Sequence, residues 1–183
     1  MSTSSDPTSD PQPDLQKVSE AALLLRQRHQ TLLLSSLNGS LPELSYAPYC
    51  CDDQGNFYIY ISQLASHTEN LKQHPQCSAM FIAEEQGCRN LFARERLSFS
   101  CRAELIEPQD GDYAPRLEQL EQQFGEVVRL LRTLPDFCLF RLCPLEGRYV
   151  AGFGRAYQLD PVGYQASPIG PEQLGKGGDN DSQ

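Results

Sequence analysis

The sequence predicts an α+β fold in which antiparallel strands close into a barrel with helices on its flanks. Apolar residues recur at helical spacing in residues 15–29 and again in residues 113–134. The segments between and after these helices alternate apolar and polar residues with the period of two that is typical of strands. Short turns separate the strands, which favours antiparallel neighbours, and closure into a barrel leaves few strand edges exposed.

The first third of the chain predicts one helix and three strands. Residues 15–29 carry one apolar stripe opposite charged residues, which indicates an opening helix. Residues 31–37 form the first strand, and Asn38-Gly39 tolerates the positive φ of a tight turn. Residues 45–51 return, and residues 56–62 then alternate strictly between an apolar face and an aromatic, polar face. That second face could line a ligand crevice or a subunit contact.

The middle of the chain predicts a short helix between strands. Residues 62–74 have helical spacing, with Ser62 as N-cap and Pro75 as the end. Residues 77–83 form an apolar strand. Residues 94–106 give the clearest strand, with one apolar face and one face of arginines and serines.

The last third predicts a helical pair followed by strands. Residues 113–134 return to helical spacing, and Gly125 indicates a break into two helices. Residues 137–142 and residues 147–150 form two strands separated by a turn at Cys143-Pro144. A last short strand follows a Gly-Phe-Gly turn.

One domain accounts for the ordered chain. Residues 15–160 contain all the periodic segments, and 183 residues lie within the usual range for a single domain. Residues 1–14 are rich in Ser, Asp and Pro, and residues 161–183 are rich in Gly and Pro without an apolar period. Both ends are therefore predicted to be disordered tails.

Charge and cysteine content limit the partners and the compartment. The net charge of −9 opposes nucleic-acid binding, which depends on Lys and Arg. The apolar runs are far shorter than the ~20 residues of a membrane-spanning helix, and the N-terminus lacks the pattern of a signal peptide. Seven cysteines without a CxxC pair or zinc-like spacing indicate reduced thiols. We expect a cytoplasmic protein that binds neither nucleic acid nor membranes.

The basic residues are unevenly distributed. Four arginines lie in one short segment, at Arg89, Arg94, Arg96 and Arg102. They could form a local anion site on an otherwise acidic surface, and the alternative is a solvated strand face.

Five blocks of sequence occur in a fixed order: LSYAPY from Leu44, ASHTENL from Ala65, NLFARERL from Asn90, LPDFCLFRL from Leu134 and GFGRAY from Gly152. Together they resemble the HutZ/HugZ haem-utilisation family over about residues 15–160. This resemblance implies a split β-barrel of the pyridoxamine 5'-phosphate oxidase type, assembled as a homodimer with its crevices along the subunit interface. It also implies haem binding in that crevice, and some members open the haem ring with oxygen and an electron donor.

The resemblance implies roles for particular residues. His67 matches the family histidine of the short helix and is the candidate metal ligand. Either Arg94 or Arg96 matches a cationic strand residue, which can pair with a haem propionate. Asp136 matches an aspartate that can orient an axial histidine.

The chain departs from the family at the axial ligand. In haem-degrading relatives a histidine follows the Gly-Phe-Gly block, but here that segment contains no histidine. His29 and His74 are expected to be exposed caps, and for His67 a ligand role and an ordinary helix position both remain open. Tyr157 or Tyr164 could supply an oxygen ligand.

FMN is the alternative cofactor, which would make the chain a flavin oxidoreductase. Flavin-binding split barrels commonly carry an Arg-Lys pair on the short helix, where this chain has Ser66-His67. Ser62, Ser66 and the helix N-terminus still offer donors to a phosphate, and Arg94 or Arg96 could add charge. The leading prediction is a haem-binding protein of haem utilisation or intracellular haem handling, for which haem degradation of the haem oxygenase type is left open. A third hypothesis is a non-catalytic dimer that acts through partners.

Overall fold

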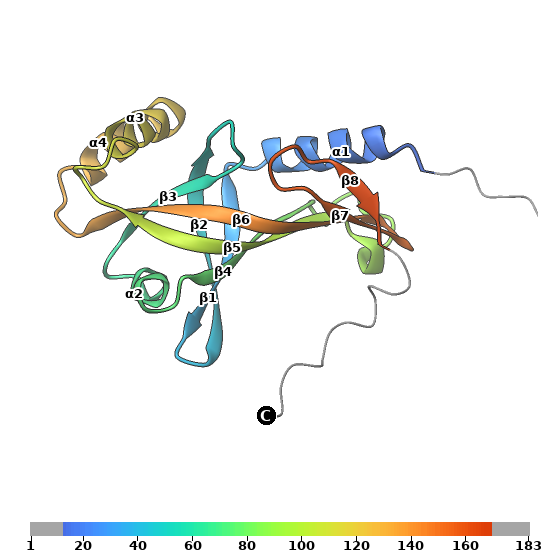
Figure 1. Cartoon of the computed structure of the whole chain (residues 1–183), viewed down its shortest axis with the longest axis horizontal. Helices are drawn as coiled ribbons and strands as arrows, with labels where there is room; N and C mark the ends of the chain where they lie inside the picture. Colours follow the sequence, from blue (N-terminus) through green and yellow to red (C-terminus); the bar gives the residue numbers. More distant parts are fainter. Residues whose placement is uncertain (1–12, 170–183) are drawn as a thin grey trace, which may run out of the picture.

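The computed structural model describes residues 13–169. Its helices and strands follow one another as α1 (Leu15–Gln27), β1 (Thr31–Asn38), β2 (Leu41–Cys51), β3 (Phe57–Ser62), α2 (Ser66–Gln73), β4 (Gln76–Ile82), η1 (Leu91–Ala93), β5 (Arg96–Ile106), α3 (Tyr113–Phe124), α4 (Glu126–Leu131), β6 (Phe137–Gly152), β7 (Arg155–Leu159) and β8 (Ala166–Pro168). In Figure 1, α3 and α4 lie at one end of the molecule and α1 and β8 at the other. Among the described residues, no helix has the length and apolar character needed to cross a membrane.

The strands form one antiparallel sheet that closes on itself. The described strands follow the order β3-β2-β1-β4-β5-β6-β7-β8, and β3 also pairs with β6. That additional pairing closes the part of the sheet from β3 to β6 into a barrel, while β7 and β8 extend from the free end of β6 (Figure 1). The predicted α+β class, an antiparallel barrel with flanking helices, is confirmed.

Aromatic side chains fill the barrel interior. Phe57 is fully buried, and its ring centroid lies 5.6 Å from Tyr49, 5.6 Å from Phe81 and 5.5 Å from Phe99. These rings come from β2, β3, β4 and β5, so they join β3 to β4 and β5, which are not its neighbours in the sheet. Each such pair contributes about 0.5–1.5 kcal/mol beyond its buried area. The core therefore holds the barrel in its closed form.

One continuous strand, β6, replaces the two strands expected after residue 136. Its first part pairs with β3, its last part with β7, and nearly its whole length with β5. The expected turn at residues 143–144 is wrong because a β-bulge accommodates the proline. Ser100 lies opposite Glu146 and Cys101 opposite Pro144, which leaves one extra residue on β6. Proline has no N–H to donate, and bulges are among the few places where a sheet tolerates it.

The bulge reverses which residues of β6 face the core. Before it, Phe140 and Leu142 point inward, and after it Tyr149 does, so even positions give way to odd ones. Arg148 therefore faces outward beside Ser98 of β5.

Helices α3 and α4 cover the outer face of the barrel at one end. Tyr58 is only 1% exposed there, and it packs in a second cluster with Leu117, Leu120 and Leu139. The aromatic face of β3 is thus mostly buried at Tyr58 beneath a helix, where this residue lines only a small cavity of about 200 Å³. The break at Gly125 is confirmed, because this residue has a φ of +74° between α3 and α4.

The ordered chain extends beyond residue 160, where the predicted domain ended. Tyr164 is buried and its ring lies 5.8 Å from that of Phe99, while Ala166 N donates to Ser19 Oγ of α1 at 3.0 Å. The expectation of a disordered tail is therefore wrong for residues 161–169. The prediction failed because this segment is held by one buried aromatic residue, Tyr164, and has no periodic pattern of apolar residues. The rest of both predicted tails lies outside the described residues, apart from residues 13–14.

Gly55 tests how residues 161–169 are held in place. A Cβ atom at Gly55 would lie 2.6 Å from the carbonyl oxygen of Pro161, and the residue has a φ of +84°. Gly39 also has a positive φ, +62°, but a Cβ there meets nothing within 4 Å. We expect Gly55→Ala to lower the free energy of unfolding by about 1–3 kcal/mol more than Gly39→Ala in urea titrations. Equal losses would show that Pro161 does not pack on this turn.

Candidate functional site

The expected site residues lie in two groups at opposite ends of the long strands. Ser62, where β3 ends, pairs with Phe137 at the start of β6, whereas Arg96 pairs with Val150 near its other end. The fourteen residues from Phe137 to Val150 correspond to roughly 40 Å of strand path. The first group contains Ser62, Ser66, His67 and Asp136, and the second contains Arg94 and Arg96. One chain does not bring the two groups together.

Hydrogen bonds fix the connection between β3 and α2 in the first group. Ser62 Oγ donates to Asp136 Oδ2 at 2.5 Å and accepts from Leu64 N at 3.1 Å. Gln63 N donates to Asp136 O at 2.7 Å, and Thr68 Oγ1 donates to Ser62 O at 2.5 Å. Asp136 is thus held against the end of β3. The expected N-cap at Ser62 is wrong, since Ser62 completes β3 and the helix begins at Ser66.

A carboxylate faces the first turn of α2. Ser66 Oγ donates to Glu43 Oε1, and Asn70 Nδ2 donates to Glu43 Oε2 at 3.2 Å. These hydrogen bonds lower the pKa of Glu43. The hydroxyl of Ser66 is therefore engaged with a negative charge of the same chain, at the position where a flavin phosphate would need a donor.

His67 is half-buried beside the same carboxylate. Partial burial lowers its pKa below the ordinary 6.5, and the charge of Glu43 opposes that shift. No residue of the described chain forms a hydrogen bond with its ring. Burial thus favours the neutral imidazole of His67, which is the form that ligates metals.

The other proposed axial ligands are occupied or buried. His29 Nδ1 lies 2.8 Å from Leu25 O and its Nε2 lies 2.9 Å from Ile82 O. Both ring nitrogens therefore face backbone carbonyl oxygens, and neither is open to a ligand. His29 was expected to be an exposed cap, but it joins α1 to β4. Tyr157 and Tyr164 are 4% and 6% exposed within the barrel core, so neither hydroxyl is available to a ligand.

The two arginines of the second group differ in their surroundings. Arg94 Nε donates to Ala83 O at 2.5 Å, and its Nη1 forms an ion pair with Glu85 at 2.9 Å. Arg96 Nη1 donates to Arg94 O at 3.0 Å, and no carboxylate of the described residues pairs with it. Arg96 is therefore the arginine of this pair that is free to bind an anion.

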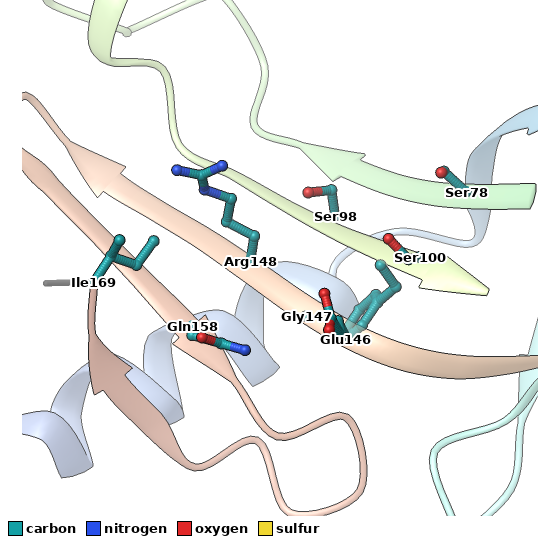
Figure 2. Close-up of a pocket in the computed structure, with 9 residues that line it drawn as sticks. Ser78, Ser98, Ser100, Glu146, Gly147, Arg148, Gln158 and Ile169 are labelled. Atoms are coloured by element: carbon teal, nitrogen blue, oxygen red, sulfur yellow. The ribbon is translucent and has the colours of Figure 1, made fainter. Parts of the chain in front are cut away.

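Two adjoining cavities lie on the outer face of the sheet beside Arg96. The first, of about 330 Å³, is lined by hydroxyls from β4 and β5 and by Arg148 (Figure 2). The second, of about 580 Å³, is lined by Arg96, Arg148 and Arg155, with Phe92 and Phe153 also in its wall. Sequence reasoning missed Arg148 and Arg155. Arg148 was missed because Pro144 was interpreted as a turn. A proline inside a long alternating segment can also indicate a β-bulge, and that signal would have placed Arg148 on the outer face.

Comparison with known proteins identifies the family. The family model for pyridoxamine 5'-phosphate oxidase matches residues 18–151. The haem oxygenase HutZ of Vibrio cholerae is 39% identical over 135 residues, covering 73% of this chain and 76% of that protein. The chain belongs to the HutZ group of the pyridoxamine 5'-phosphate oxidase family.

Solved structures of this family share the fold. HutZ of Vibrio cholerae, described as a haem storage protein, superposes with a TM-score of 0.64 at 35% identity, covering 69% of this chain and 89% of that chain. Campylobacter jejuni ChuZ gives a TM-score of 0.75 at 25% identity, covering 92% of this chain and 68% of that chain. The split barrel of the pyridoxamine 5'-phosphate oxidase family is therefore confirmed.

The protonation of His67 gives a test of the first group. Its imidazole should titrate below 6.5 in NMR spectra, and its midpoint should fall further in Glu43→Gln, which removes the charge that opposes the shift. Because the unfolded chain binds this proton more tightly, the free energy of unfolding should also decrease as the pH falls below 6.5. His67→Gln assigns the resonance and should remove this contribution. A midpoint at or above 6.5 would contradict the burial of the ring.

Proposed function

We propose that this chain is a cytoplasmic, homodimeric haem-binding protein of haem utilisation or intracellular haem handling. A row of residues across the outer face of the sheet supports this most directly. In register, Tyr46 lies opposite Leu33, Leu33 opposite Met80, Met80 opposite Ser98, and Ser98 opposite Arg148. The row passes from apolar to cationic across five strands. Haem has the same character, with an apolar ring and two carboxylates.

The apolar part of this face favours a second copy of the chain. Leu44 is 79% exposed and Tyr46 67%, although both lie on regular strands. Exposed apolar surface of this kind on a sheet usually marks an interface. In a two-fold dimer the same patch serves both subunits. Each crevice can then combine the His67 group of one subunit with the arginine group of the other, which one chain keeps apart.

The residues present are suited to haem. Haem iron needs only an axial ligand from the protein, and neutral, half-buried His67 can act as one. No cluster of three or more His, Cys, Asp or Glu that could hold a bare metal ion occurs among residues 13–169. Arg96 can pair with a propionate, and Asp136, fixed by Ser62, can accept a hydrogen bond from a ligand or water in the crevice. Bound haem would supply an iron centre for oxygen chemistry.

The proposal concerns haem binding and does not extend to ring opening. The relative with 39% identity is named a haem oxygenase, but the segment after Gly154 contains no histidine. An axial histidine from that segment is therefore absent.

The second candidate is an FMN-dependent oxidoreductase, which the family model favours. The carboxylate of Glu43, which accepts from Ser66 and Asn70 at the start of α2, opposes a flavin phosphate there. Arg96 could still bind such a phosphate. Haem is the better fit because its carboxylates need no donor from α2.

Haemin titration tests the proposed function. Purified protein should show a saturable Soret shift at micromolar concentration, and it should not quench the fluorescence of added FMN. His67→Ala should weaken haemin binding and alter the Soret band, because an iron ligand is lost, whereas His74→Ala should leave both unchanged. Absence of a saturable shift would refute haem binding, and quenching of FMN alone would favour the flavin candidate.

A charge introduced into the apolar face tests the dimer. Tyr46→Glu should shift the protein from dimer to monomer in light scattering and should reduce haemin affinity at least tenfold, because the crevice needs both subunits. Leu130→Glu is the matched control, since Leu130 is 64% exposed on α4 and lies outside this face. A monomeric wild type that binds haemin tightly would contradict the two-subunit crevice.

A further inference from the structure

Three arginines around the second cavity lack acidic partners. Within residues 13–169, Arg148 forms no hydrogen bond or ion pair with its side chain, and Arg155 Nη2 donates only to Ala151 O at 3.1 Å. Arg96 donates only to Arg94 O. Five other arginines of the described chain pair with carboxylates: Arg94, Arg116, Arg129, Arg132 and Arg141. The remaining arginines of the described chain form no ion pair either, but none of them lines this cavity. Unpaired guanidinium groups gathered in one place repel one another, and a bound anion removes that repulsion.

The surroundings of these arginines fit a ligand that is partly apolar and flat. Phe92 is 94% exposed and Phe153 is 82% exposed, and both line the cavity that holds Arg96, Arg148 and Arg155. An aromatic ring that is exposed to solvent and does not pack in the core is available to stack against another flat group. Aromatic and cationic side chains thus lie in the wall of one cavity.

Hydroxyl groups extend the cationic surface along the sheet. Figure 2 shows Ser98, Ser100 and Ser78 on the same face as Arg148, with Gln158 next to Arg148 on β7 and Glu146 opposite Ser100 on β6. Ser98 and Arg148 line both cavities, so the two form one continuous recess. Its cavities, about 330 and 580 Å³, are within the size range of small-molecule sites.

We propose that Arg148 and Arg155, together with Arg96, bind the carboxylates of a flat, apolar ligand that lies against Phe92 and Phe153. A guanidinium binds a carboxylate through two parallel hydrogen bonds, which a lysine does not reproduce. The inference rests on the proposed function in naming haem as the ligand, and it adds the residues that hold the propionates. A phosphate monoester, as in FMN, is the other source of the same anionic oxygens.

An iron-free porphyrin isolates the anion site from iron ligation. Wild-type protein should bind protoporphyrin IX at least tenfold more tightly than its dimethyl ester, measured by porphyrin fluorescence, because the ester has no charge for the arginines. The double variant Arg148→Gln/Arg155→Gln should lose most of this preference, since each contact to a charged group contributes about tenfold or more to affinity. Arg148→Lys keeps the charge and should retain an intermediate preference.

Arg89→Gln is the matched control. Arg89 is exposed and lines neither cavity, so its loss removes the same charge without touching the site. It should preserve the preference for the diacid. Thermal melts should show that all variants remain folded, because Arg148 and Arg155 are exposed and form no ion pair within the described chain.

The outcomes separate this inference from the proposed function. An unchanged preference for the diacid in Arg148→Gln/Arg155→Gln, or an equal loss in Arg89→Gln, would overturn the anion site while leaving haem binding intact. Failure of the wild type to bind any porphyrin would refute the proposed function. The same variants are then compared on FMN and riboflavin: a loss of the preference for FMN in the double variant supports the site, and no such preference in the wild type overturns it.

Discussion

The three pairings of β6 are the constraint on which the rest of this structure depends. One part of the strand closes the barrel against β3, nearly its whole length pairs with β5, and its last part carries β7. Because of the bulge at Pro144, the residues of β6 that face the core are even-numbered before it and odd-numbered after it. Without the extra residue, Arg148 would point into the aromatic core and Tyr149 toward solvent. Barrel closure and the outward arginine surface therefore have the same structural cause.

The distribution of charge follows from this arrangement. The net charge of −9 means that the chain has more carboxylates than basic side chains. At the end of the sheet near α3, Arg141 forms ion pairs with Glu104 and Asp112. The ion pair with Asp112, the residue before α3, links β6 to the start of the helix that covers Tyr58. At the other end of β5 and β6, the outward residues that line the two cavities are mainly arginines and hydroxyls, and Glu146 is the one carboxylate among them. The same two strands thus carry one end where arginine is paired with carboxylates and another end where the arginines form no ion pair within residues 13–169.

Sequence periodicity predicted the features that depend on neighbours in the chain. The alternation of β5, the break at Gly125 and the fold class needed only local patterns and turn chemistry. The bulge was missed because its proline resembled a turn, and Arg148 was missed with it. The local sequence predicts an exposed cap at His29 because the contact of its ring with Ile82 O joins residues 53 positions apart. Tyr58 was assigned to an open face because the helix that covers it follows more than fifty residues later. Such long-range contacts leave no local pattern.

The separation of the two residue groups is the structural reason for proposing a dimer. Ser62, His67 and Asp136 lie where β3 meets β6, and the arginines lie near the far end of the same strand, so no hinge within a closed barrel can join them. A second copy with two-fold symmetry can place one group opposite the other without deforming either subunit. The carboxylate of Glu43 makes the α2 end unfavourable for an anion, which leaves the negative groups of a ligand to the arginine end. In the proposed dimer, a ligand oriented in this way would have its charge on one subunit and its centre near His67 of the other. That polarity matches a flat molecule with acidic groups along one edge, which is the shape of haem.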